Sequence, residues 1–197
     1  MAALPLILAS ASPRRRDLLT HAGVAFEVLP ANVPEERGSA EAPETFARRL
    51  AEAKARAVAN RVGAQPRRWV LGADTIVVLG DTVFGKPRDP EHALELLAQL
   101  RGQTHRVLTA ICLLASDTGD ACTTLVESHV RMHTASDAEL RAYVATGEPL
   151  DKAGAYAIQG EGRRFVAEIE GSESNVIGLP LDETLALLAQ AEARANS

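Results

Sequence analysis

Apolar and polar residues follow one another in an order that predicts alternating strands and helices over the first part of the chain. The run LPLILAS at residues 4–10 is apolar enough for a buried strand. The stretch after it opens with Ser12 and Pro13, residue types that begin helices, and it ends before Gly23, a residue type that ends them. A second helix is expected from Pro43 to about Asn60. Its apolar stripe comprises Phe46, Leu50, Ala53 and Ala57.

The rest of the chain is predicted to add antiparallel strands to this α/β pattern. The expected elements are a strand at 69–79, a hairpin turn at Gly80-Asp81, a helix from Asp89-Pro90 to Leu100, strands at about 104–115 and 122–133, a helix from a Ser136/Glu139 capping box to near Gly147, a β pair of AYAIQ with RFVAEIE, and a helix from Asp182 to about Ala195. This order favours an α/β fold with a mixed, partly antiparallel sheet and flanking helices. Residues 31–43 are read as a loop. No repeat or linker is found, so a single domain over residues 1–197 is predicted.

The overall charge and composition narrow the choice of partners. A formal net charge of -5 argues against a protein whose main partner is nucleic acid, because its overall field repels polyanions. No stretch approaches the roughly 20 apolar residues of a membrane span, and MAALPLILAS lacks a basic region and a cleavage signal. We therefore expect a cytoplasmic protein with no membrane partner. Cys112 and Cys122 are read as reduced core residues.

The stretch SASPRRRDLL places three arginines, residues 14–16, at the beginning of a predicted helix. Cations oppose the helix dipole there, so local helix stability does not explain them. A helix N-terminus offers backbone N–H groups to an anion, and arginine pairs well with phosphate oxygens. Ser10, Ser12, Arg14 and Arg15 are therefore predicted to bind phosphate, with a solvated basic helix face as the alternative. On this view, replacing Arg15 leaves the fold intact or slightly more stable.

Asp74 lies in the apolar strand VLGADTIVVL. A buried carboxylate costs several kcal/mol unless a partner compensates it. Asp74 is read either as a structural aspartate or as a general base or metal ligand, with Thr75 on the opposite face of the strand.

Two lysines and two glutamates extend this candidate site. Lys54 lies beside the apolar stripe of the second helix, and Lys86 lies in FGKPRD just past the hairpin. Both add positive charge suited to phosphate, although a lysine that reaches solvent is the simpler interpretation of each. Glu35 and Glu36 offer oxygen ligands that would help Asp74 hold Mg²⁺.

Seven sequence blocks in a fixed order resemble one known family. The blocks are SASPRRRDLL, LAEAKARA, LGADTIVVL, GKPRD, GQTHRVLTA, PLDKAGAYAIQG and NVIGLPL. They run from about residue 6 to residue 188, and the chain resembles the Maf family of nucleotide pyrophosphatases. The resemblance implies an elongated α/β fold with a central cleft, related to the inosine-triphosphate pyrophosphatases and commonly a homodimer. It also implies conversion of a nucleoside triphosphate and water to the monophosphate and pyrophosphate, with Mg²⁺ or Mn²⁺.

The resemblance also assigns roles to residues of this chain. The matching positions are Ser10, Arg14 and Arg15 for phosphate, Lys54 and Lys86 for the two lysines, Asp74 for the catalytic aspartate, and Glu35 or Glu36, with Glu35 favoured, for the loop glutamate. The branch acting on dTTP and UTP carries Arg, Thr and Gln at three positions, here Arg14, Thr75 and Gln159. A glutamine offers the donor and the acceptor that the imide edge of thymine or uracil requires. Without the resemblance, Gln159 is read as a turn residue before Gly160.

The mechanism that these assignments imply has Asp74 accepting a proton from water that attacks at the α–β phosphate linkage. A divalent cation would be held partly by Asp74 and the loop glutamate, and the sequence leaves open whether Asp74 is mainly base or ligand. Two alternatives remain. One is a phosphatase that releases orthophosphate. The other is a regulatory nucleotide-binding protein, suggested by the family's association with septum formation in cell division.

Overall fold

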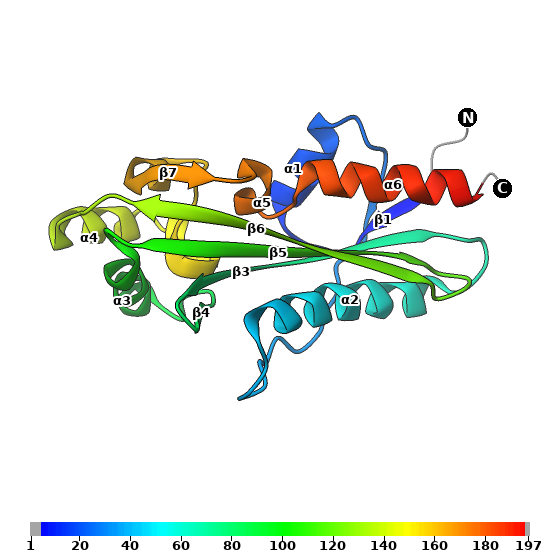
Figure 1. Cartoon of the computed structure of the whole chain (residues 1–197), viewed down its shortest axis with the longest axis horizontal. Helices are drawn as coiled ribbons and strands as arrows, with labels where there is room; N and C mark the ends of the chain where they lie inside the picture. Colours follow the sequence, from blue (N-terminus) through cyan, green and yellow to red (C-terminus); the bar gives the residue numbers. More distant parts are fainter. Residues whose placement is uncertain (1–4, 196–197) are drawn as a thin grey trace. The chain divides into compact units, whose positions relative to one another are not determined.

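The computed structural model of the chain describes residues 5–195 and contains a seven-stranded sheet (Figure 1). The strand order is β2-β1-β3-β5-β6-β7, with β4 paired to β3. The strands are β1 (Leu6–Leu8), β2 (Glu27–Val28), β3 (Trp69–Leu79), β4 (Thr82–Phe84), β5 (Thr104–Ala115), β6 (Ala121–Met132) and β7 (Val166–Glu170). Strand β1 runs parallel to β2 and β3, whereas β3–β4 and β6–β7 are antiparallel. The predicted mixed sheet is therefore confirmed.

The helices follow the chain between these strands. They are α1 (Pro13–His21), α2 (Pro43–Val62), α3 (Pro90–Leu100), α4 (Asp137–Ala145), α5 (Glu173–Ile177) and α6 (Leu181–Ala195), with 3-10 turns η1 (Glu148–Asp151), η2 (Ala153–Ala155) and η3 (Glu161–Phe165). Five of the six α-helices were predicted, and α5 was not. No helix within residues 5–195 is long and apolar enough to cross a membrane.

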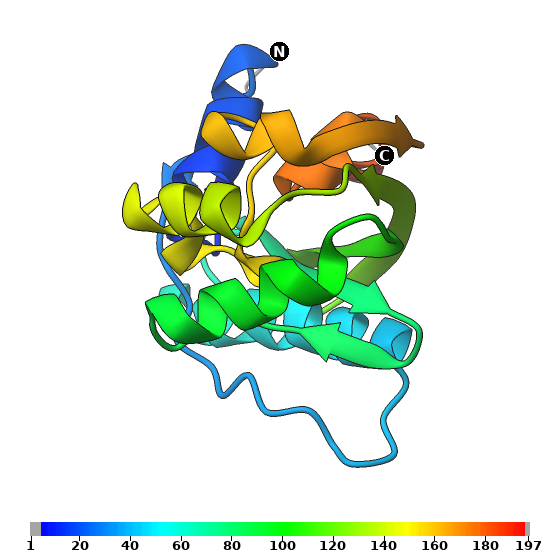
Figure 2. The same cartoon turned by 90° about the vertical axis from the view of Figure 1, so that its left-hand side faces the viewer.

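The described residues form two compact units. Unit 1 contains the residues up to Asp74, Thr109–Val126 and those from Gly178 onward, and unit 2 contains Thr75–Leu108 and Glu127–Ile177. Within unit 1, α2 covers one face of the sheet while α1 and α6 cover the other (Figure 1). Within unit 2, α3 and α4 lie side by side (Figure 2). Each unit encloses an apolar core of its own.

The local signals at helix ends and turns are largely confirmed. Asp89 caps α3 by accepting the backbone N–H of His92 at 2.7 Å, and Ser136 and Glu139 form the predicted capping box of α4. Leu79 and Thr82 pair across the predicted two-residue turn. Ser12 stands at the N-cap of α1, but its side chain makes no capping hydrogen bond.

The predicted stripe of α2 is correct at two of its four positions. Phe46 and Leu50 are buried, whereas Ala53 and Ala57 are only half-buried. The buried face includes Ala47, Ala51, Ala55, Val58 and Ala59 instead. The predicted stripe already has the helical period, so the buried face differs from it by a rotation of the helix. Ala51 and Ala55 face β3 so closely that a Cβ on Gly72 would lie 2.2 Å from the Ala51 carbonyl oxygen.

The predicted strand AYAIQ, residues 155–159, is absent. Gly154 and Ala155 have φ values of 70° and 58°, so the backbone turns through the left-handed region where a strand would need extended residues. Only the VAEIE part of the predicted partner forms a strand, β7, and it pairs with β6. Strand β1 covers part of the predicted strand at residues 4–10, of which Leu4 lies outside the described residues.

The two cysteines differ in exposure. Both are free thiols, and Cys112 is buried while Cys122 is exposed. The expectation of two reduced core residues is therefore right for Cys112 and wrong for the burial of Cys122.

A buried histidine in unit 2 predicts a pH-dependent stability. His105 lies against the Tyr156 hydroxyl at 2.7 Å from its Nε2, and burial lowers the pKa of His105 from 6.5 to about 4. The unfolded chain therefore takes up this proton first as the pH falls. We expect the stability contribution to be complete above pH 6.5 and to fall by about 3 kcal/mol as the pH drops to about 4.

The variant His105→Gln should lose this part of the pH dependence. Urea unfolding of both proteins at several pH values between 4 and 7 measures it as the difference between the two stability curves. Parallel curves would contradict the assignment, because the other titrating groups are shared by both proteins.

Candidate active site

Arg15 is a buried cation that joins separate parts of unit 1. It lies in the first turn of α1, and only 9% of the residue is exposed. Its Nε donates to the Gly178 carbonyl at 2.7 Å, and its Nη1 donates to the Ala73 carbonyl at 2.9 Å and to the Ser10 hydroxyl at 3.1 Å. These bonds argue against the expectation that removing Arg15 leaves the fold intact, because three acceptors would lose their donor.

Ser10 lies at the point where β1 gives way to α1. Its hydroxyl oxygen also accepts the backbone N–H of Ser12 at 3.2 Å, and the residue is buried. The Ser10 hydroxyl thus fixes the backbone just before the helix and the guanidinium of Arg15 at the same time.

Lys54 joins two carboxylates in unit 1. Its Nζ lies 2.6 Å from Asp74 Oδ1 and 2.6 Å from Glu35 Oε1. Lys54 comes from α2, Asp74 from β3 and Glu35 from the predicted loop at 31–43. The lysine side chain is 12% exposed, so it does not reach into solvent as the simpler interpretation held. Of the two candidate glutamates, Glu35 is the one whose carboxylate reaches this lysine.

Burial and nearby positive charge have opposite effects on the pKa of Asp74. The residue is 5% exposed, and burial raises the pKa of its carboxyl above the usual range, while Lys54 and then Arg15 act in the opposite direction. Burial also lowers the pKa of the Arg15 guanidinium, which Asp74 partly offsets. The outcome is a carboxylate of raised basicity with a lysine as its hydrogen-bond donor.

The structure therefore brings five of the predicted site residues together in unit 1. They are Ser10, Arg15, Lys54, Asp74 and Glu35. Arg14 lies half-buried in the same first turn of α1, and its charge lowers the pKa of Arg15. The N-terminus of α1, a serine hydroxyl and a lysine-paired aspartate thus belong to one cluster.

The other three predicted residues belong to unit 2, where they lie on three separate segments. Thr75 is half-buried in β3, Lys86 is exposed after β4, and Gln159 is exposed after η2. The loop of Lys86 is tied to η2, because the Gly85 carbonyl accepts the backbone N–H of Gly154 at 3.1 Å.

The cluster in unit 1 suits a cation that is shared with phosphates. Asp74 and Glu35 converge on one ammonium group, so two carboxylates are available to one positive charge. Mg²⁺ is commonly bound through one or two carboxylates plus substrate phosphates and water. Among residues 5–195, no group of three or more His, Cys, Asp or Glu side chains is placed to hold a metal ion. The two carboxylates fit such a shared cation as its protein ligands.

Sequence reasoning missed the partners that hold this cluster. Arg15 donates to backbone carbonyls, which every residue possesses, so no sequence signal marks Ala73 or Gly178. The Lys54–Asp74 pair did leave a signal, since a lysine beside an apolar stripe and an aspartate in an apolar strand each need an opposite charge.

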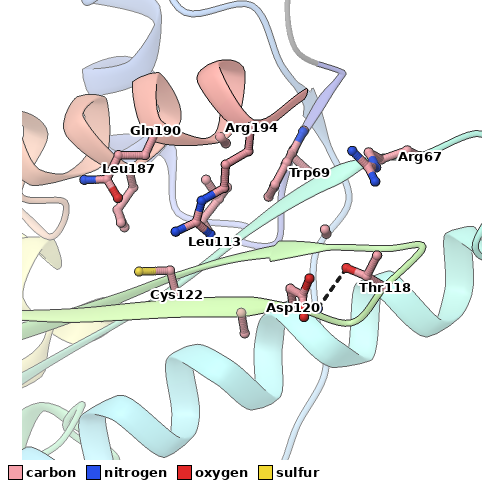
Figure 3. Close-up of a pocket in the computed structure, with 12 residues that line it drawn as sticks. Arg67, Trp69, Leu113, Thr118, Asp120, Cys122, Leu187, Gln190 and Arg194 are labelled. Carbon is pink, nitrogen blue, oxygen red and sulfur yellow. Dashed lines mark hydrogen bonds between the residues drawn. The ribbon is translucent and has the colours of Figure 1, made fainter. Parts of the chain in front are cut away.

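A cavity of about 240 Å³ in unit 1 is lined by other residues (Figure 3). Gln190 and Arg194 of α6 and Cys122 of β6 are among those that line it. Its Arg67 pairs with Asp117 at 2.6 Å. The cavity is therefore separate in its lining from the cluster around Asp74.

The architecture and the cluster define an α/β protein with a group of paired charged side chains at a helix N-terminus. The family model described as "Maf-like protein" matches residues 5–191. The chain belongs to this family, as its resemblance indicated.

Curated relatives match the chain over nearly its whole length. A protein of Anaeromyxobacter dehalogenans named "dTTP/UTP pyrophosphatase" is 51% identical over 188 residues, 94% of this chain and 93% of that protein. One of Myxococcus xanthus with the same name is 49% identical over 186 residues, 94% and 92% of the two chains. Among solved structures, a nucleoside-triphosphatase / dITP/XTP pyrophosphatase of Mycobacterium abscessus is 16% identical, covers 66% of this chain and 74% of its own, and has a TM-score of 0.40.

Proposed function

We propose that this protein is a nucleoside triphosphate pyrophosphatase that hydrolyses dTTP and UTP to the monophosphate and pyrophosphate. Membership of the Maf-like family and the shared name of relatives at about half identity support this activity. The observation that carries it is the buried Asp74, paired with Lys54 at 2.6 Å and within the electrostatic reach of Arg15. A carboxylate of raised basicity beside a helix N-terminus suits proton abstraction near a bound phosphate.

The proposed reaction uses Asp74 as the general base. Asp74 accepts a proton from water as the water oxygen bonds to phosphorus at the α–β linkage. The bond to the bridging oxygen breaks, and the electron pair leaves with pyrophosphate. Arg14, Lys54 and Lys86 are proposed to stabilise the negative charge of the phosphates. Arg15 bonds to Ser10 and to the backbone at Ala73, next to Asp74, and it adds positive charge to the site.

A divalent cation is proposed as the cofactor, with Asp74 and Glu35 as its protein ligands. When bound, Mg²⁺ or Mn²⁺ supplies neutralising charge to the phosphates and lowers the pKa of a coordinated water. Lys54 bridges the same two carboxylates, so it holds them together in the cation's absence. A homodimer and a cytoplasmic location, both expected from the sequence, stay predictions.

The identity of the released product tests the activity. Purified protein is incubated with dTTP or UTP and Mg²⁺ or Mn²⁺, and pyrophosphate, orthophosphate and monophosphate are measured together. Equal amounts of monophosphate and pyrophosphate are expected. Orthophosphate as the first product would make the protein a phosphatase. Nucleotide binding without turnover would favour the regulatory nucleotide-binding protein.

Base selectivity is proposed to depend on Arg14, Thr75 and Gln159. Gln159→Glu exchanges an amide donor for a second acceptor and sets a carboxylate against a base carbonyl. We expect kcat/KM for dTTP and UTP to fall by roughly 10-fold or more, because a site that hydrogen-bonds its substrate penalises a mismatched group.

Gln159→Ala is the matched control, since it removes the contact without adding repulsion. It should cost less for dTTP than the glutamate does, while every residual substrate still yields pyrophosphate. Equal hydrolysis of dTTP and UTP by the wild type and both variants would show that Gln159 does not read the base.

A further inference from the structure

The segment 157–162, which carries Gln159, is held by hydrogen bonds on both sides of that residue. Before it, the Ala157 backbone N–H donates to the Tyr143 hydroxyl at 3.2 Å. After it, the backbone N–H groups of Glu161 and Gly162 donate to the Glu148 carboxylate, each at 3.0 Å. The Tyr143 hydroxyl itself donates to Glu148 at 2.8 Å, so the two anchors are one connected group.

The anchors themselves are fixed by the fold of unit 2. Tyr143 is fully buried on α4, and its ring packs against Phe165 with the ring centres 5.2 Å apart. The Glu148 backbone N–H donates to the Thr146 hydroxyl at 3.2 Å, and its carbonyl accepts from Lys152 Nζ at 2.6 Å. The segment 157–162 is therefore bonded to groups that are held in place by other bonds.

The glycines of the segment fit this arrangement closely. A Cβ on Gly160 would lie 2.5 Å from Glu148 Oε2, and a Cβ on Gly162 would lie 2.4 Å from the Tyr143 hydroxyl oxygen. Side chains at these positions would displace the carboxylate or the phenol. The sequence IQGEG thus leaves space for both anchors.

Charge strengthens the bonds to Glu148. Burial alone would raise its pKa, but the N–H groups of Gly162 and Glu161 and the Tyr143 hydroxyl hold the pKa of Glu148 below its usual range. The group is therefore an ionised carboxylate at neutral pH, and hydrogen bonds to an ionised acceptor are stronger than neutral ones. Gln159, in contrast, is exposed, and no hydrogen bond of its side chain to another described residue is found.

We infer that Glu148 is a positioning residue for base selection: it fixes the backbone around Gln159 so that the glutamine amide is presented in one orientation to the nucleotide base. The inference rests on the proposed function, in which Gln159 reads the imide edge of thymine or uracil. Glu148 does not contact the substrate in this role. An amide held on a mobile segment would lose part of its preference for one base, because each wrong orientation presents donor and acceptor to the wrong atoms.

The test is a double-mutant cycle on substrate selectivity. The quantity measured is kcat/KM for dTTP divided by kcat/KM for dCTP, two nucleotides that differ at the base edge which Gln159 is proposed to read. Glu148→Gln keeps the size of the side chain but places an amide NH₂ against at least one backbone N–H. It is expected to lower the ratio by roughly 10-fold, the scale of one hydrogen bond to a charged group. Combined with Gln159→Ala, it should lower the ratio little beyond Gln159→Ala alone.

A second variant and a control separate this role from a general loss of structure. Tyr143→Phe keeps the buried ring and removes the hydroxyl, so it should lower the ratio in the same direction. Glu161→Gln removes one negative charge from the same segment without changing a backbone donor, and its ratio should stay at the wild-type value. Amide exchange at residues 161 and 162 should speed up in Glu148→Gln, which checks the anchor independently of activity.

The possible outcomes are distinct. A lowered ratio in both single variants, without further loss in the double variant, supports the inference. If Gln159→Ala lowers the ratio and Glu148→Gln does not, or if the two losses simply add, positioning by Glu148 is overturned and base reading by Gln159 stands. If Gln159→Ala leaves the ratio unchanged, base reading fails, and the inference fails with it.

Discussion

Asp74→Asn is expected to lower kcat by at least about 100-fold, within the usual range for the loss of a general base. The asparagine keeps the shape of the side chain and removes the group that accepts the proton. Measurement of pyrophosphate release at saturating dTTP and Mg²⁺ gives the change in kcat. The outcome that would remove Asp74 from the mechanism is near-normal turnover at saturating metal.

The same substitution should leave the thermal stability unchanged or raise it. Burial raises the pKa of Asp74, so its contribution to stability is complete below the ordinary pKa and is lost as the pH rises through the raised value. At neutral pH the buried charge is therefore a net cost, which asparagine removes. Asp120→Asn, at an exposed position of unit 1, is the matched control and should change neither kcat nor the melting temperature.

Arg15→Ala is expected to lower the free energy of unfolding by about 3 kcal/mol or more, because three acceptors lose a buried charged donor. The alanine cannot replace the bonds to Gly178, Ala73 and Ser10. Activity measured on the folded fraction should also fall, since Arg15 no longer bonds α1 to the middle of β3, next to Asp74. Urea unfolding at neutral pH measures the change in stability.

The neighbouring arginine supplies the control. Arg16 is exposed, and Arg16→Ala should change stability by no more than about 0.5 kcal/mol. Arg15→Lys should fall between the two, because one ammonium group cannot reproduce the planar fork of a guanidinium. Equal stabilities of Arg15→Ala and Arg16→Ala would mean that the three bonds contribute nothing to folding.

Elements with strong local signals could be predicted from the sequence. Helix α3 is bounded by a capping aspartate and by Gly102, and β3 is an apolar run that ends at a two-residue turn, so both were placed correctly. AYAIQ has the composition of a strand, yet its Ala157 backbone N–H donates to the Tyr143 phenol, and the residues that follow it donate to the Glu148 carboxylate. No local pattern contains that information.

In the candidate site too, the residues with a local sequence signal could be predicted and the tertiary contacts could not. Asp74 and Lys54 were singled out because each is out of place in an apolar pattern, and the structure pairs them. The sequence did not predict that Arg15 bonds distant segments together, because the prediction for Arg15 considered only its unfavourable position at the positive end of the helix dipole. Its acceptors come from distant segments, and tertiary contacts to backbone carbonyls outweigh the local effect of the dipole.

The sequence distances within these two bonded groups imply an order of assembly during synthesis. The bonds of Glu148 to Tyr143, Glu161 and Gly162 join residues only 5, 13 and 14 positions apart, so they close short loops. The bond from Arg15 to Gly178 spans 163 positions. During synthesis from the N-terminus, the bonds of Glu148 around Gln159 can therefore form before Gly178, the last acceptor of Arg15, has been added to the chain. The bonds around Gln159 can then be complete before Arg15 has all three of its acceptors, because a nascent chain that ends before Gly178 lacks one of them.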